Sequence, residues 1–201
     1  MLKSFSGSIG AGILISIGGC VLLACDNRYI GAVLFSVALL SICYLGCYLF
    51  TGKIGFLLED LSPKNMARLL IGLAGNLLSV YLIGLCVRFA IPSLGNQAES
   101  LFASKLTQSF PQTLIRAIFC GVLMYIAVVI FRDSKTPIGI LFCIPVFILC
   151  GFEHSVADMF YFGTSGLADG RAWLFFVAAV LGNTLGSLIL PLLQKIGGKS
   201  Q

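Results

Sequence analysis

The amino-acid sequence predicts an all-α integral membrane protein of six transmembrane helices, arranged as an inverted repeat of three plus three with broken second and fifth helices. Of its 201 residues, 58% are hydrophobic and only 10% are charged, whereas soluble globular domains carry about 25% charged residues. The mean hydropathy is +1.02. The apolar runs are long and continuous, unlike the roughly ten-residue alternating segments of an outer-membrane barrel. At about 20 residues per span, the chain has room for about six helices.

The first half of the chain holds three expected spans, near residues 5–25, 29–51 and 66–91. The first is rich in glycine, which lets membrane helices approach closely, and it ends at a polar turn over residues 26–28. The second carries Gly46 and Gly52 on either side of a segment that can leave the helix. The third contains Gly75-Asn76, and an asparagine side chain can satisfy the backbone groups that a broken helix leaves free.

The second half holds three more expected spans, near residues 111–131, 137–162 and 172–194. The fourth span carries Arg116 within its apolar run. The fifth contains Pro145, which removes a backbone donor, and then the polar break Gly151-Phe152-Glu153-His154-Ser155. The sixth contains Gly182-Asn183, the counterpart of the Gly-Asn pair in the third span.

The two halves, about 1–95 and 105–201, echo each other across the polar stretch 93–110. Gly46 precedes Asn76 by 30 residues, and Gly151 precedes Asn183 by 32. Because three spans per half is an odd number, the halves have opposite orientations in the bilayer. Inverted repeats of this kind place a substrate site near the midplane, at interrupted helices whose free backbone lines a cavity. We therefore expect residues 1–201 to form a single transmembrane channel domain.

The basic residues predict the orientation in the membrane. Eight lie at the N-terminus, in alternate loops and at the C-terminus, and four lie on the opposite side: Lys3, Lys53, Lys64, Arg68, Arg132, Lys135, Lys195 and Lys199 against Arg28, Arg88, Lys105 and Arg171. By the positive-inside rule this distribution places both termini in the cytoplasm. We expect a multi-pass protein of the cell inner (cytoplasmic) membrane. The basic residues are spread over loops and do not form a patch that would bind nucleic acid.

The pair Glu153-His154 is the most unusual feature of the apolar sequence, because His154 is the only histidine and lies in a predicted span. Ionisable groups at membrane depth are costly and mark functional sites by default. His154 is therefore the first candidate for a functional residue. The alternative is a buried histidine that only bridges helices through hydrogen bonds.

Several functional classes find no support in the residues. The eight cysteines lie within or at the edges of the spans and form no CxxC pair, so we expect neither disulfides nor a metal site. One histidine and scattered carboxylates offer no catalytic set, phosphate loop or HExxH motif. We therefore expect no enzyme activity and no cofactor.

The sequence resembles the formate/nitrite transporter family, whose members are pentameric channels for small monovalent anions with an aquaporin-like fold. The resemblance lies in Leu49-Phe50-Thr51-Gly52, Arg116 to Cys120, Gly151 to Ala157 and Gly182-Asn183, and its order and spacing cover all six spans. The chain departs from the family pattern at Asp158 and Gly121, where the family usually carries asparagine.

The resemblance implies a pore through each protomer of a homopentamer in the lipid bilayer. His154 would face Thr51 at its centre, with Asn183 supporting the same site and Lys105 at the outer vestibule. We expect Glu153 to orient His154 or to brace the broken helix, and not to line the pore. Two apolar constrictions would flank the centre: Phe35, Leu39 and Phe147 on the cytoplasmic side, with Leu49 and Phe50 near the central loop.

The expected function is a transmembrane channel or transporter for small monovalent weak-acid anions, namely formate, nitrite or hydrosulfide. An apolar constriction stops a bare anion but not its neutral acid, so a central histidine that interacts with or protonates the anion would allow passage. A water or neutral-solute channel of the same architecture is the alternative, although neither Asn76 nor Asn183 belongs to an Asn-Pro-Ala motif.

Overall fold

The structure, a computed structural model, describes residues 1–198, and all regular elements in this range are helices. Lys199, one of the basic residues used to predict orientation, lies outside the described residues. The elements are α1 (Leu2–Ala24), α2 (Arg28–Leu45), α3 (Phe50–Lys53), a 3₁₀ helix η1 (Ile54–Glu59), α4 (Pro63–Ala90), α5 (Pro92–Lys105), α6 (Phe110–Ser134), α7 (Ile138–Leu149), α8 (Ser155–Ser165) and α9 (Arg171–Ile196). The prediction of an all-helical membrane protein is confirmed.

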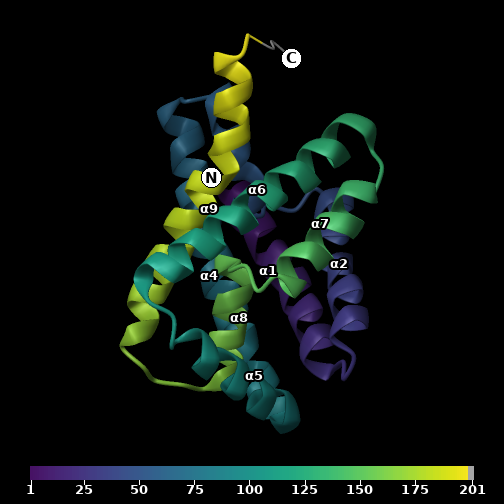
Figure 1. Cartoon of the computed structure of the whole chain (residues 1–201), viewed down its shortest axis with the longest axis vertical. Coiled ribbons are helices and arrows are strands. Elements are labelled where there is room, and N and C mark those ends of the chain that lie inside the picture. Colours follow the sequence, from purple (N-terminus) through teal and green to yellow (C-terminus); the bar gives the residue numbers. More distant parts are fainter. Residues whose placement is uncertain (199–201) are drawn as a thin grey trace.

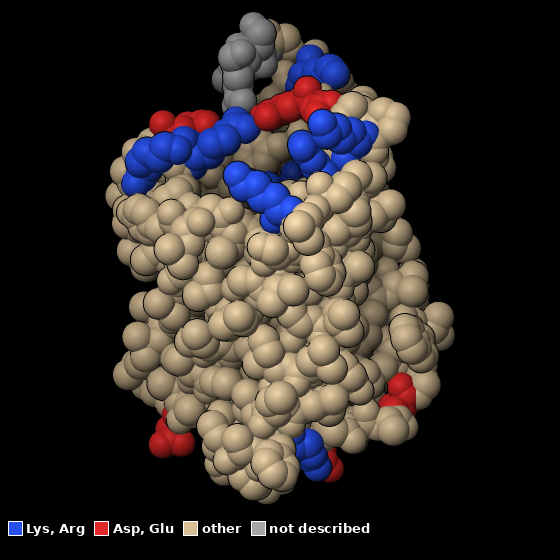
Figure 2. All heavy atoms as spheres, turned by 180° about the vertical axis from the view of Figure 1, so that it is seen from behind, with Lys and Arg blue, Asp and Glu red and all other residues tan. Residues whose placement is uncertain are grey.

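Within residues 1–198, five helices are long and apolar enough to cross a membrane: α1, α2, α4, α6 and α9. The predicted second span is α2 followed by the short α3, and the predicted fifth span is α7 followed by α8. The break between α7 and α8 is the short non-helical segment in the middle of the molecule (Figure 1). On the face shown in Figure 2, the charged residues gather at the two ends of the molecule, with an uncharged band between them, as a bilayer of about 30 Å hydrocarbon thickness requires.

Helix α5 was not expected, because its residues form the polar stretch between the predicted halves. Pro92 occupies the first turn of α5, where a proline costs no hydrogen bond. Leu94, Ala98 and Phe102 recur every four residues and are buried, so one face of this otherwise polar helix packs against the protein. The helix ends at Lys105 and thereby fixes the position of that side chain.

The helices of the two halves pack in the same pattern. In the first half α1 packs against α2 and α4, and in the second half α6 packs against α7 and α9. Across the halves, α4 packs against α8, while α9 packs against η1. A methyl group on Gly186 of α9 would lie 1.9 Å from the carbonyl oxygen of Ile118 on α6. Only glycine therefore allows α6 and α9 to approach this closely.

Glycine also ends the first helix of each broken pair. Gly46 follows α2 with a φ of 67°, and Gly151 follows α7 with a φ of 69°. These are left-handed conformations that glycine adopts without the Cβ penalty of other residues. The chain then runs extended into α3 and α8, whose N-terminal ends lie in the interior of the protein.

Candidate functional site

The break before α8 is held by Asn183 of α9, which is fully buried. Its Nδ2 donates hydrogen bonds to the carbonyl oxygens of Glu153 (2.8 Å) and Ala117 (2.9 Å). Its Oδ1 accepts a hydrogen bond from the backbone N–H of Ser155 (2.9 Å). One amide thus satisfies three backbone groups at a depth where water cannot reach them, and unsatisfied groups of this kind are rare in proteins.

Asn76 of α4 does the same for the break before α3. Its Nδ2 donates to the carbonyl oxygens of Ser8 (2.9 Å) and Tyr48 (3.0 Å), and its Oδ1 accepts from the N–H of Phe50 (2.8 Å). In each half the bonded carbonyl and N–H groups of the break lie two residues apart in the sequence. The two Gly-Asn pairs recognised in the sequence therefore make equivalent contacts in the two halves.

Thr51 and His154 meet where the two broken helices face each other. The Oγ1 of Thr51 lies 2.8 Å from Nε2 of His154, and the two side chains are 1% and 2% exposed. The other ring nitrogen, Nδ1, accepts a hydrogen bond from the backbone N–H of Ala157 (3.1 Å) and so caps the N-terminus of α8. Because Nδ1 accepts, the ring proton lies on Nε2, which donates to Thr51. The hydroxyl proton of Thr51 is then left to donate to another group.

A cavity of about 520 Å³ reaches this pair from one end of the molecule. We name it the first cavity; its lining includes Arg28, Phe35, Lys105, Phe147, His154 and Asp158. The ring of Phe147 stacks on that of His154, with centroids 5.8 Å apart. Phe35 packs edge-on against Phe147 at 6.2 Å. The apolar part of this cavity therefore lies directly beside the central histidine.

The polar wall of the first cavity is built around Lys105. Its ammonium forms ion pairs with a carboxylate oxygen of Glu153 and with Oδ1 of Asp158, the latter at 3.0 Å. The other oxygen of Glu153 accepts a hydrogen bond from Nε2 of Gln108 (2.7 Å). Glu153 thus braces the broken helix against α5, and its side chain bonds Lys105 and Gln108, whereas the ring of His154 is oriented by Ala157 and Thr51.

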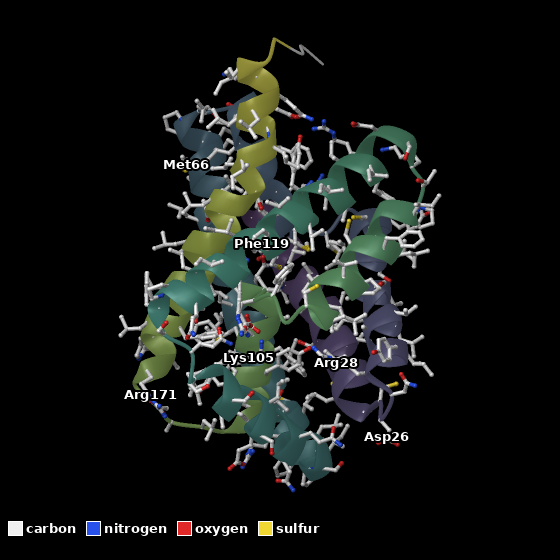
Figure 3. The ribbon with its side chains drawn as sticks, in the orientation of Figure 1. Asp26, Arg28, Met66, Lys105, Phe119 and Arg171 are labelled. Atoms are coloured by element: carbon white, nitrogen blue, oxygen red, sulfur yellow. The ribbon has the colours of Figure 1, made fainter. Side chains whose placement is uncertain are left out.

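Arg28 contributes a further positive charge to the first cavity. Its guanidinium donates to the carbonyl oxygens of Ile148 (3.0 Å) and Leu149 (3.1 Å) at the C-terminal end of α7. Carbonyl groups carry no full charge, so the positive charge of Arg28 still acts on the cavity. In Figure 3, Arg28 and Lys105 lie inward of Asp26 and Arg171, which lie nearer the periphery of the same end.

Arg171 differs from Arg28 because its charge is compensated. It hydrogen-bonds to the carboxylate of Asp169 at 2.7 Å, and these bonds lower the pKa of Asp169 from its ordinary value. Asp169 lies in the turn between α8 and α9. The pair provides a charge-matched comparison for Arg28 at the same end of the protein.

A second cavity, of about 370 Å³, opens at the opposite end and shares no lining residue with the first. Leu39 and Leu49 line its inner part and are 2% and 1% exposed. Lys53 and Lys135 line its outer part. These two lysines belong to the set that predicted the cytoplasmic side.

The expected constrictions are arranged differently from the prediction. Phe35 and Phe147 line the first cavity, together with Lys105, whereas Leu39 lines the second cavity with Leu49. The prediction that grouped Phe35 and Phe147 with Leu39 on one side was therefore wrong. The reason is helix geometry: Phe35 and Leu39 are one turn apart on α2, which places them on the two sides of the central pair.

The position of the Phe50 side chain also differs from the predicted constriction. Its side chain packs with Ile54, Leu57 and Leu69 in a core cluster separate from the main one, and lines neither of the two cavities. The backbone N–H of Phe50 is held by Asn76, and the side chain points away from the break into the contact with α4.

Two features of the site were not predicted from the sequence. Asp158 was noted only as a departure from a pattern, although it lies four residues after His154 and so on the same face of a helix, which was the available signal. The contact of Gln108 with Glu153 depends on the turn after α5 and had no signal in the sequence.

Comparisons with known proteins agree with the fold and the motifs. A family model described as formate/nitrite transporter matches residues 1–195. The uncharacterized transporter YrhG of Bacillus subtilis (strain 168) is 29% identical over 184 residues, which are 81% of this chain and 68% of that protein. The formate channel BtFdhC of Bacillus thuringiensis is 27% identical over 177 residues, 78% of this chain and 68% of that protein.

Two solved structures share the fold. An FNT family ion channel superimposes with a TM-score of 0.85 at 24% identity, covering 99% of this chain and 91% of that chain. A pentameric formate channel with formate bound superimposes with a TM-score of 0.75 at 22% identity, covering 97% of this chain and 96% of that chain. The chain thus shares its overall fold with two channels of known structure.

Proposed function

The chain belongs to the formate/nitrite transporter family, and we propose that it is a channel for small monovalent anions of weak acids: formate, nitrite or hydrosulfide. The family is one of transporters and channels, not of enzymes. The pore runs through the protomer from the first cavity to the second and passes the Thr51–His154 pair. The observation that carries the proposal is this pair, a buried donor site between two cavities with apolar side chains on both sides.

The apolar side chains explain the preference for weak acids. A bare anion that passes Phe147 on one side and Leu49 on the other loses its water, which costs far more than moving a neutral molecule. A weak acid can cross these regions in its neutral form. At the centre, the hydroxyl of Thr51 donates a hydrogen bond to the permeating molecule, and His154 polarises that hydroxyl by donating to it. The neutral tautomer set by Ala157 supports hydrogen bonding as the role of His154, and not proton donation.

Assembly and location follow from the relatives and the charge pattern. One structural neighbour is named as a pentamer, and this chain exposes many large apolar side chains around its uncharged band. We infer a homopentamer in the cytoplasmic membrane, with one pore per protomer and both termini in the cytoplasm. Lys53, Lys135 and the other basic residues of that end support this orientation.

Flux into liposomes tests the proposal. Protein reconstituted into liposomes should take up formate, nitrite or hydrosulfide faster than empty liposomes, and more rapidly as the pH is lowered. His154→Phe should reduce the uptake, because Thr51 then loses its polarising partner. Unchanged uptake and pH dependence in His154→Phe would refute the role given to the central pair. Osmotic swelling in the absence of these anions would instead favour a water or neutral-solute channel.

A further inference from the structure

The carboxyl group of Asp158 is only half satisfied. Asp158 lines the first cavity, and its side chain is 2% exposed. Its Oδ1 is 3.0 Å from the ammonium of Lys105. Its Oδ2 is buried and has no hydrogen-bond partner among the described residues. An ionised carboxylate has about four acceptor sites, so a bare, buried oxygen is an unfavourable state for a charged group.

The charge balance around Lys105 points to the same oxygen. One ammonium faces two buried carboxyl groups, Glu153 and Asp158. If both were ionised, the site would carry an uncompensated negative charge away from water, which is strongly unfavourable. Two carboxyl groups that share a site therefore retain a proton between them. Both oxygens of Glu153 already have donors, from Lys105 and Gln108. The proton thus belongs on Oδ2 of Asp158.

The other titratable groups near Asp158 do not compete for this role. Tyr161 on α8 and Cys120 on α6 lie within electrostatic range of Asp158, but phenols and thiols are neutral near pH 7. In His154, Nδ1 accepts a hydrogen bond from Ala157, and Nε2–H donates a hydrogen bond to Thr51. At the mouth of the cavity, Asp26 is exposed to water and Arg28 donates to α7. Asp158 is left as the buried acid among the residues that line the cavity.

We propose that Asp158, held as a neutral carboxylic acid beside Lys105, gives its proton to the weak-acid anion in the first cavity before the anion reaches the central pair. The Oδ2–H bond breaks and the bond from hydrogen to the anion forms, while the electron pair stays on Asp158. The new carboxylate shares the single ammonium of Lys105 with Glu153, so this state is unfavourable and takes a proton back readily. A proton from water in the cavity then restores the acid, and one proton accompanies each anion.

The position of Asp158 suits this order of events. It lies four residues, about one helical turn, after His154. An anion drawn into the first cavity by Arg28 therefore meets Asp158 before it passes Phe147 and Thr51. This inference depends on the proposed function, since it names the proton source for the same pore.

The first test is the protonation state of Asp158, measured by infrared difference spectroscopy on the full-length protein in liposomes. At neutral pH we expect a carbonyl stretching band of a protonated carboxylic acid, which is lost in Asp158→Asn. The band should shift but persist in Asp158→Glu, so the assignment stands even if Asp158→Asn folds poorly. Addition of formate should reduce the band, because the proton is transferred.

The second test is the pH dependence of formate uptake through the neutral range, well above the pKa of formic acid. In Asp158→Asn only protons from bulk water are available, so uptake should fall about tenfold per pH unit. Wild type and Asp158→Glu should fall less steeply, as long as the buried acid holds its proton. Glu99→Gln on α5 is the matched control: Glu99 is exposed and pairs with Arg88, and its profile should run parallel to that of wild type.

The outcomes separate this inference from the proposed function. A spectrum without an acid band that follows Asp158, or an Asp158→Asn profile parallel to that of wild type, would overturn the donor role while leaving the channel intact. No uptake of any of the three anions by wild type would overturn the proposed function and the donor role with it. The infrared band would still show whether Asp158 holds a proton.

Discussion

Thr51→Val is the most direct perturbation of the central pair. Valine has nearly the shape of threonine but no hydroxyl, so the change removes polar chemistry and leaves the packing of α3 in place. Two hydrogen bonds are affected. Nε2–H of His154 loses an acceptor at 2.8 Å, and the permeating molecule loses the donor that the Thr51 hydroxyl supplies.

The magnitude follows from the second loss. The permeating molecule is neutral at this point, and a hydrogen bond between neutral groups contributes about 0.5–1.5 kcal/mol, which corresponds to a roughly 2- to 13-fold lower flux. In Thr51→Val the freed Nε2–H of His154 can donate to the permeating molecule instead, so we expect the lower end, about twofold. The double variant Thr51→Val with His154→Phe lacks both donors and should reach the upper end. Thr51→Ser keeps the hydroxyl and should stay close to wild type.

Radiolabelled formate uptake into liposomes measures these differences, with the amount of reconstituted protein matched between variants. Thr164→Val is the control, because Thr164 is also fully buried, and its hydroxyl donates only to the carbonyl of Phe160 (2.9 Å) within its own helix. Uptake by Thr164→Val should equal that of wild type. Equal uptake by Thr51→Val and Thr164→Val would refute the assignment of Thr51 as a donor to the permeating molecule.

Three further substitutions test the parts that hold and charge the pore. Asn183→Ala leaves three buried backbone groups without partners, each costing about 1–3 kcal/mol. Its melting temperature in detergent should fall well below that of Thr184→Val, which loses one hydrogen bond within its own helix. Similar melting temperatures of the two variants would contradict this expectation. Arg28→Gln should reduce anion uptake severalfold at low ionic strength and less at high salt. Arg171→Gln should leave uptake unchanged, because the charge of Arg171 is already paired with Asp169. Equal uptake by both variants would count against a role of Arg28 in attracting anions. Gly186→Ala places a methyl group 1.9 Å from a carbonyl oxygen of α6. The substitution should lower the melting temperature and the yield of folded protein. An unchanged melting temperature would disprove this expectation.

Much of the fold could be predicted from the sequence because the bilayer imposes simple rules. Apolar runs of span length must be helical, since no water satisfies the backbone in hydrocarbon. The breaks were also visible, because Gly46 and Gly151 interrupt such runs beside polar residues, and each is followed by a Gly-Asn pair at a matched distance. Helix α5 escaped this reasoning. Its sequence is polar, and only burial of Leu94 and Phe102 against the rest of the protein shows that it is ordered.

The site was only partly predictable. The spacing of the Gly-Asn pairs indicated Asn183, whereas the expectation that Thr51 faces His154 came from the resemblance to the family. The side on which a residue lies along the pore was not predictable in the same way. Phe35 and Leu39 are one turn apart on α2, and which of them faces the first cavity depends on the height of the central pair relative to α2, a property of packing between the halves.

The sequence by itself determined the membrane fold, the two breaks and His154 as the first candidate for a functional residue, because hydropathy and the cost of buried polar groups act locally and leave a readable pattern. Only the tertiary structure decided how protons and charges are distributed around them. From the sequence, Lys105 was expected as a cation of the outer vestibule. In the folded chain it forms ion pairs with Glu153 in the break before α8 and with Asp158 in the first turn of α8. Electrostatic partners depend on distance in space, so the half-satisfied Asp158 became apparent only once α5 and α8 were packed together.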